Sequence, residues 1–132
     1  NADSSWTNLG AGEFIDRYVF PDGELPHVSL VLKEMTAAGL EATDVESLRR
    51  HYARTCQEWA SRLEANRERA MQIAGERRLR IWQIYLAGSA YGFANGWMNI
   101  HQVLGCKAAN TQAKPLPLTR DYMYAMRADA AA

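Results

Sequence analysis

Residues 40–106 read LEATDVESLRRHYARTCQEWASRLEANRERAMQIAGERRLRIWQIYLAGSAYGFANGWMNIHQVLGC, and this stretch decides the fold. Strand character at its two ends, over 40–48 and 98–106, encloses a long stretch of helical periodicity. The periodicity falls into two runs, one ending at Gly75 and one at Gly96. Their apolar positions are Cys56, Trp59, Ala60, Leu63, Ala70 and Ile73 in the first run, and Trp82, Tyr85, Leu86, Ser89 and Phe93 in the second. We therefore predict the order strand, helix, helix, strand.

Two shorter helices are predicted ahead of this unit. Residues 13–20 form the first candidate, which Pro21 ends because proline disfavours helix at the residue before it. The segment PDGELP (21–26) has the composition of a loop. Apolar side chains at helical spacing over 28–35 predict the second helix, and Gly39 stands where its C-cap would lie.

The two predicted strands need partners, because two strands alone make a sheet of little stability. The chain also begins with Asn1 rather than methionine. We therefore expect residues 1–107 to be one part of a larger α/β domain, helix-rich as it stands. Residues 108–132 contain Pro115 and Pro117 and end in small residues, so we expect a loosely ordered tail there.

The charges balance over the chain but not locally. Fifteen basic side chains stand against fifteen acidic ones, whereas residues 49–80 hold nine arginines and four glutamates. Alternating arginine and glutamate on a helix is typical of a solvated face with ion pairs one turn apart. The alternative is that these arginines contact anionic lipid headgroups.

Several function classes find no support in the sequence. Cys56 and Cys106 are the two cysteines, and no CxxC motif or histidine cluster accompanies them, so neither a disulfide framework nor a metal site is indicated. No apolar run is long enough for a membrane span, and no Gly-rich phosphate or cofactor loop is present. We expect a reducing, cytoplasmic setting and no nucleic-acid partner.

Three segments resemble a known family. FIDRYVFPDGELPHV (14–28), DVESLRRHYARTCQEWASRLEAN (44–66) and RIWQIYLAGSAYGFANGWMNIHQVLGCK (80–107) are similar, in order and spacing, to the C-terminal third of cyclopropane fatty acid synthases and mycolic acid cyclopropane synthases. The most specific parts are FP-x-G-x-LP and HYART-x-x-x-W. These enzymes are class I methyltransferases dependent on S-adenosylmethionine (SAM). The resemblance implies the last two strands and covering helices of a Rossmann-like sheet, with the SAM site upstream and none of its ligands in this chain.

The resemblance also implies a chemistry. In the family, the double bond of an unsaturated acyl chain takes the methyl group of SAM, which leaves a carbocation in an apolar tunnel. A bound bicarbonate then removes a proton and the cyclopropane ring closes, or loss of a different proton gives a methyl or methylene branch. Dry walls and one polar group for the anion are what this reaction requires.

The resemblance assigns roles to individual residues. Tyr52, in HYART, matches the tyrosine whose hydroxyl holds the bicarbonate. We expect the neighbouring His51 to be solvated, because adjacent helical residues point to different faces. The positions that match the acyl-tunnel wall are Phe20, Leu25, Cys56, Tyr85, Ser89 and Phe93. Such a stripe is also what a plain core would show. Ser89 stands where the mycolic acid enzymes carry cysteine, and Cys56 where leucine is common, which leaves the acyl chain open.

The expected partners are an unsaturated acyl lipid, the missing N-terminal part of the same domain and, as a further candidate, a second copy of the chain. Peripheral contact with the inner face of an anionic membrane would suit a lipid substrate. The chain alone is expected to be inactive. Two alternatives stay open: a SAM-dependent methyltransferase acting on a small natural product, and a non-catalytic helical interaction module.

Overall fold

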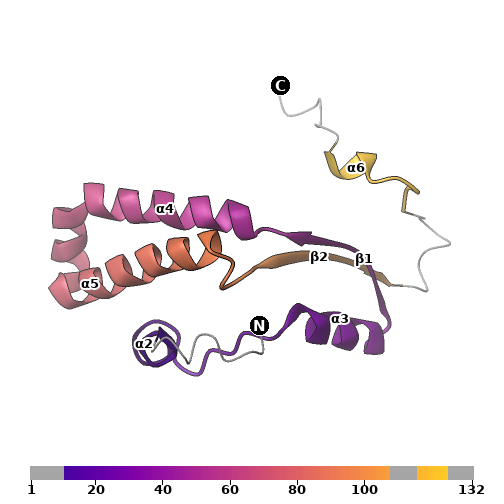
Figure 1. The fold of residues 1–132 in the computed structure, drawn as a ribbon, viewed down its shortest axis with the longest axis horizontal. Helices are drawn as coiled ribbons and strands as arrows, with labels where there is room; N and C mark the ends of the chain where they lie inside the picture. Colours follow the sequence, from indigo (N-terminus) through magenta and orange to yellow (C-terminus); the bar gives the residue numbers. More distant parts are fainter. Residues whose placement is uncertain (1–10, 108–115, 125–132) are drawn as a thin grey trace.

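The computed structural model describes residues 11–107 and 116–124. Their elements are α2 (Ala11–Tyr18), α3 (Val28–Ala37), β1 (Leu40–Ser47), α4 (Arg49–Ala65), α5 (Arg67–Ala94), β2 (His101–Lys107) and α6 (Asp121–Tyr124). Figure 1 shows α4 and α5 extending as a pair from one end of the two strands, with α2 beside the helical pair and α3 beside the strands. The strand, helix, helix, strand order predicted for 40–106 is confirmed.

α2 ends in a tight turn within the FPDGELP loop. The amides of Val19 and Phe20 both donate to the Ile15 carbonyl at 2.9 Å, which closes the helix just before the loop. The Gly23 amide then donates to the Phe20 carbonyl at 3.1 Å. Asp22 adopts a positive φ of 58°, and its amide donates to Asp16 Oδ1 at 3.0 Å. An aspartate tolerates this left-handed conformation better than most residues.

α3 is capped at both ends by local contacts. His27 precedes it, and its Nδ1 accepts a hydrogen bond from the Ser29 amide at 3.2 Å. At the other end Gly39 has φ 81° directly after the C-cap residue Ala38. A positive φ costs a residue with a side chain about 1 kcal/mol or more, so glycine is the natural residue there. The helix predicted over 28–35 is confirmed.

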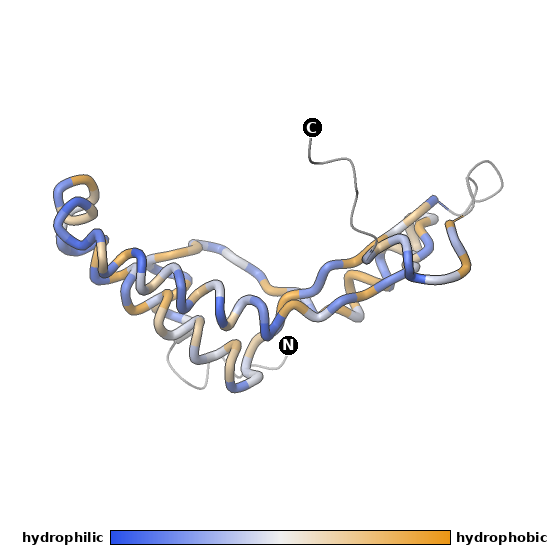
Figure 2. Tube along the Cα trace, turned by 90° about the horizontal axis from the view of Figure 1, so that it is seen from above, coloured by the Kyte–Doolittle hydropathy of each residue, from blue (hydrophilic) through white to orange (hydrophobic). Residues whose placement is uncertain are grey.

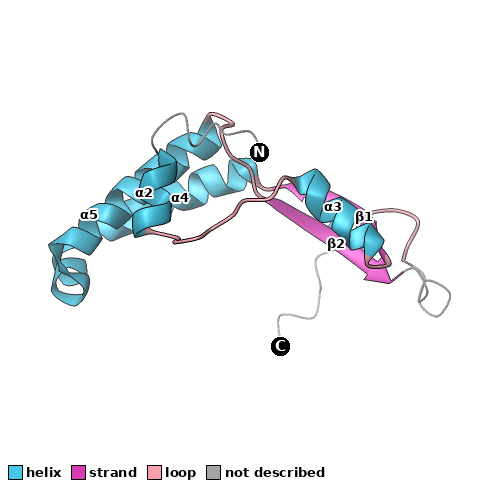
Figure 3. Cartoon of the chain, turned by 90° about the horizontal axis from the view of Figure 1, so that it is seen from below, coloured by secondary structure: helices cyan, strands magenta, loops and turns pink. Residues whose placement is uncertain are grey.

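β1 and β2 form an antiparallel hairpin-like sheet. The register runs from Leu40 opposite Lys107 to Ser47 opposite His101, with an irregularity between Ala42 and Asp44. The helix α3 covers one face of the strands, as Figure 3 shows. Its Met35 reaches Gly105, where an added Cβ would lie 2.6 Å from Met35 Cε.

The second strand begins three residues later than predicted, at His101 rather than Met98. The intervening residues are held by other contacts. The Trp97 amide donates to the Gly92 carbonyl at 2.9 Å, which keeps it on the end of α5. Asn99 Oδ1 accepts from Ser47 Oγ at 2.9 Å, so its side chain and not its backbone meets β1. These residues therefore join α5 to the sheet.

The first long helix was wrongly predicted to continue to Gly75. α4 ends at Ala65, and Asn66 turns its side chain back so that Nδ2 donates to the Arg62 carbonyl at 2.8 Å. α5 starts at Arg67 and is itself interrupted at Gly75, with φ 79° and ψ 160°. The extra break changes the helical phase. Ile73, which follows this break and was predicted on the packed face, is 76% exposed. Trp59, within α4 and predicted on the same face, is 48% exposed.

The buried core of the described residues is small. The buried apolar side chains are Cys56, Leu79, Leu86 and Phe93. Large apolar side chains elsewhere are open to solvent, among them Ile84 and Tyr91. In Figure 2 hydrophobic and hydrophilic residues interleave along the described parts of the chain. So much exposed apolar surface is typical of helices that cover part of a larger fold, as expected for a sheet of only two strands among the described residues.

The predicted boundary at residue 107 coincides with the end of β2. Most of the predicted tail, 108–115 and 125–132, lies outside the described residues. Within 116–124, α6 forms and Arg120 Nη2 makes an ion pair with Asp44 Oδ1 of β1 at 2.9 Å.

Candidate functional site

The candidate site lies along the seam between α4 and α5. Cys56 on α4 is 4% exposed, and Leu86, Ser89 and Phe93 on α5, the helix that packs against α4, are also buried. Leu86, Ser89 and Phe93 fall at i, i+3 and i+7 on α5 and so occupy one face of that helix. We call Cys56, Leu86, Ser89 and Phe93 the seam cluster. The helical spacing in the sequence had predicted that these three residues of α5 share a face.

Tyr52 lies at one end of the seam cluster. It is half-buried in the first turn of α4, one turn before Cys56. Its ring packs on Phe93 with centroids 5.5 Å apart and planes tilted by 53°. A tilted aromatic pair of this kind is worth about 1 kcal/mol beyond its buried area. The phenol is thereby held beside the seam, and its catalytic role remains a prediction. His51 is exposed, as expected.

Ser89 brings an unusual polar atom into the seam. It is 2% exposed, and its Oγ has no hydrogen-bond partner among the described residues. A helical serine commonly returns its hydroxyl to the carbonyl four residues earlier. A buried hydroxyl without a partner costs about 1–3 kcal/mol, so such atoms are often placed for a ligand or a water molecule.

Cys56, unlike the polar Ser89, is a buried side chain of apolar character. Burial raises the pKa of its thiol above the ordinary value of 9.0, because the charged thiolate is poorly solvated there. The neutral thiol is a small apolar group and a weak nucleophile. Cys56 is therefore a buried apolar group rather than a reactive thiol.

A second aromatic group joins the FPDGELP loop to α5. Phe20 meets the Tyr85 ring edge-on with centroids 5.7 Å apart, and Tyr85 meets Trp82 in the same way at 5.4 Å. Phe20 and Tyr85, which the sequence predicted to line one tunnel, are thus in contact. Leu25 is 70% exposed and lies outside the seam cluster.

Arg49 fixes the end of α5 against the start of α4, a role that the sequence did not predict. Its Nη1 donates to the carbonyls of Phe93 at 2.7 Å and Ala94 at 3.1 Å. These are among the last carbonyls of α5, which have no partners within the helix. A cation at this end also interacts favourably with the helix dipole. Arg49 therefore helps to hold Phe93 in place beneath Tyr52.

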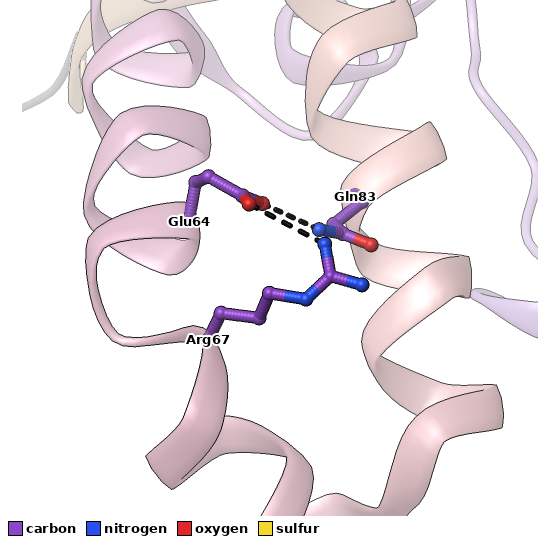
Figure 4. A network of polar contacts seen from close by, with 3 residues as sticks. All are labelled: Glu64, Arg67 and Gln83. Carbon is purple, nitrogen blue, oxygen red and sulfur yellow. Dashed lines mark hydrogen bonds and ion pairs between the residues drawn. The ribbon is translucent and has the colours of Figure 1, made fainter.

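The far end of the helical pair is held by a polar network, drawn in Figure 4. Glu64 of α4 accepts from Gln83 Nε2 of α5 at 2.6 Å and pairs with Arg67 Nη1 at 3.4 Å. These groups are solvent-exposed, so each contact contributes at most about 1 kcal/mol. The two networks, at Arg49 and at Glu64, clamp the seam at both ends.

The described residues contain neither a metal site nor a membrane-spanning helix. No group of three or more His, Cys, Asp and Glu side chains in 11–107 and 116–124 is arranged to hold a metal ion. None of the helices described is both long and apolar enough to cross a membrane.

The chain is similar to a family of known proteins. The family model for mycolic acid cyclopropane synthetase matches residues 2–103. The chain belongs to the mycolic acid cyclopropane synthetase family. A probable fatty acid methyltransferase of Pseudomonas putida is 53% identical over 124 residues, which cover 94% of this chain and 32% of that protein.

Two solved structures of the same family share the fold. The mycolic acid cyclopropane synthase CmaA1, complexed with SAH and CTAB, superposes with a TM-score of 0.72 at 32% identity, covering 78% of this chain and 36% of that one. MmaA2 from Mycobacterium tuberculosis gives a TM-score of 0.71 at 30% identity, covering 76% and 35%. The chain thus spans about a third of the length of the family members that it matches. The predicted fold class, an α/β portion of a class I methyltransferase, is confirmed.

Proposed function

We propose that this chain forms the acyl-binding wall of a SAM-dependent methyltransferase that transfers a methyl carbon to the double bond of an unsaturated fatty acyl chain. The product would be a cyclopropane or a methyl- or methylene-branched chain. One observation carries the proposal: in a chain of the mycolic acid cyclopropane synthetase family, the buried seam between α4 and α5 has the phenol of Tyr52 at its end. Tyr52 packs on Phe93 at that end, and Cys56 is buried one turn further along.

The SAM site does not fit on the described residues. Strand β1 runs directly into α4 through Leu48, with no glycine at the turn and no side-chain cap. Such a turn offers no cradle of free amides for the cofactor. We therefore assign no residue of this chain to SAM, which would supply the electrophilic methyl group from elsewhere in the protein.

The wall itself must not react with positive charge that develops on the acyl chain. Cys56 meets this requirement, because its raised pKa keeps the sulfur protonated and weakly nucleophilic. Leu86 and Phe93 supply inert surface, and the face of the Phe93 ring also favours a nearby cation. Water would compete for the cation, and the burial of these side chains limits its access.

Bicarbonate fits the donors present. The Tyr52 hydroxyl can donate a hydrogen bond to an oxyanion while remaining a poor nucleophile at neutral pH. When bound there, bicarbonate would accept the proton that leaves the added methyl carbon as the ring closes. Tyr52 would hold and orient it, and the contact with Phe93 would keep the phenol at the seam.

A chimaera tests the function. The matching segment of the Pseudomonas putida protein, 53% identical, is replaced by this chain and expressed in cells whose membranes contain unsaturated acyl groups. Mass spectrometry of the lipids should show acyl chains heavier by one methylene group. SAM binding by the chimaera serves as the control for folding. Unchanged acyl masses in cells where the chimaera binds SAM and the parent protein is active would contradict the proposal.

A further inference from the structure

The tip of the helical pair, residues 62–80, is set apart from the seam. It comprises the end of α4, the turn at Asn66 and the start of α5. Gly75, with φ 79° and ψ 160°, breaks α5 inside this region and turns residues 67–74 away from the rest of the helix. Figure 1 shows the tip at the end of the helical pair that is remote from β1 and β2. Further strands would pair along the edges of that sheet, at the opposite end.

Apolar side chains project from the tip. Ile73 is 76% exposed and Met71 is 44% exposed. Figure 2 shows a short hydrophobic stretch at this end of the pair, bordered by hydrophilic residues. Exposing a large side chain such as isoleucine forgoes roughly 2 kcal/mol of burial, so a partner for this stretch is favoured.

Unpaired positive charge surrounds the apolar side chains. The tip holds six arginines and three glutamates. Two of the glutamates are taken up in ion pairs along the helices, Glu64 with Arg67 and Glu76 with Arg80. Four exposed arginines form no ion pair with any residue in the described ranges, namely Arg62, Arg69, Arg77 and Arg78. Arg77 lies over the Tyr18 ring of α2, with its Cζ 5.7 Å from the ring centroid, which leaves Arg62, Arg69 and Arg78 for an outside partner. An apolar centre with a cationic border complements a surface that is anionic outside and apolar beneath.

We propose that the tip, residues 62–80, docks on the surface of an anionic phospholipid membrane. Ile73 and Met71 enter the interface while Arg62, Arg69 and Arg78 contact headgroup phosphates. The inference extends the proposed function by placing the helical pair, and with it the seam, at the membrane that holds an acyl substrate. Docking itself requires no methyl transfer, so the two proposals can fail separately.

Vesicle binding of the 132-residue chain tests the proposal. Sedimentation with phosphatidylglycerol vesicles should carry the chain down at low salt, whereas phosphatidylcholine vesicles should not. Binding should weaken as salt shortens the range of electrostatic attraction. The double variant Arg69→Gln/Arg78→Gln should lower the partition coefficient roughly 30-fold, which corresponds to about 1 kcal/mol for each arginine. Ile73→Ser should also weaken binding but leave its salt dependence unchanged.

A control variant with the same change in charge distinguishes docking by the tip from general electrostatic attraction between the chain and the vesicle. Arg50→Gln/Arg54→Gln removes two exposed arginines near the other end of α4 and should bind as the parent chain does. Amides of residues 67–74 should also gain protection from hydrogen exchange when vesicles are added. Equal loss of binding in both double variants, equal binding to the two lipids, or no binding to phosphatidylglycerol would each overturn the proposal. Loss of binding with intact methylation of a detergent-dispersed substrate in the chimaera would leave the proposed function standing.

Discussion

Replacing Arg49 by methionine tests the contacts that hold the Tyr52 end of the seam. The Arg49 guanidinium donates to the carbonyls of Phe93 at 2.7 Å and Ala94 at 3.1 Å. Methionine keeps an unbranched apolar stem of similar length but offers no donor. The variant therefore removes the two hydrogen bonds and the charge with little change in packing.

The loss of free energy expected in this variant follows from the two hydrogen bonds and the charge that are removed. A hydrogen bond to a charged group contributes roughly 1.5–3 kcal/mol, and a cation at a helix C-terminus roughly 0.3–1 kcal/mol more. Ala94 is exposed, so water replaces part of the lost interaction at its carbonyl. We expect a net loss of about 2 kcal/mol, which corresponds to roughly 30-fold in a local opening equilibrium.

Amide hydrogen exchange at the end of α5 measures this loss directly. The amides of Asn95, Gly96 and Trp97 donate to the carbonyls of Tyr91, Phe93 and Gly92. In Arg49→Met they should exchange roughly 30-fold faster, because they open with the end of the helix. Arg50→Met is the matched control, since Arg50 is the exposed neighbour of Arg49 on the same turn of α4.

Equal exchange in Arg49→Met and Arg50→Met would refute the clamp. It would mean that the local contact of Asn95 Nδ2 with the Tyr91 carbonyl, at 2.9 Å, is enough to hold the end of α5. Arg49 would then lose its role in positioning Phe93.

Three further changes test other parts of the structure. Gly75→Ala should destabilise the helical pair by roughly 1–3 kcal/mol, since φ 79° with ψ 160° is accessible almost only to glycine, and an unchanged urea midpoint would rule out this kink. Ser89→Ala should leave stability unchanged or raise it by about 1 kcal/mol, because the hydroxyl has no described partner, and a clear loss of stability would reveal one. The raised pKa of Cys56 predicts a pH effect: the unfolded chain loses the thiol proton first, so stability should fall as the pH rises above 9.0. Cys56→Ala should lack that fall, and an equal pH dependence in both proteins would contradict the burial effect.

Much of the fold could be predicted because long periodic segments dominate the chain. The spacing of Leu86, Ser89 and Phe93 was enough to place them on one face, and Gly39 and Gly75 marked two chain breaks correctly. The break at Asn66 was missed, because Asn66 ends α4 through a side-chain contact with Arg62 and no glycine or proline marks the site. The start of β2 was missed for a similar reason, since side-chain contacts of Asn99 replace strand pairing.

Some residues of the candidate site could likewise be predicted from the sequence, and others could not. Helical spacing predicted Cys56 on α4 and the members of the seam cluster that lie on α5, whereas Tyr52 was supplied by the resemblance alone. Arg49 escaped detection, because its partner Phe93 lies 44 residues away and no periodic pattern links two such positions. A charged residue at the first turn of a helix is ordinarily solvated, so its type gave no signal.

The most direct test of the account is Tyr52→Phe in the chimaera with the Pseudomonas putida protein. The substitution removes the hydroxyl and keeps the ring that packs on Phe93 at 5.5 Å. Turnover of an unsaturated acyl substrate should fall about tenfold or more, the cost of losing a hydrogen bond to a charged group, while affinity for SAM stays as in the parent chimaera. Unchanged turnover would remove Tyr52 from the catalytic machinery and with it the central role proposed for this chain.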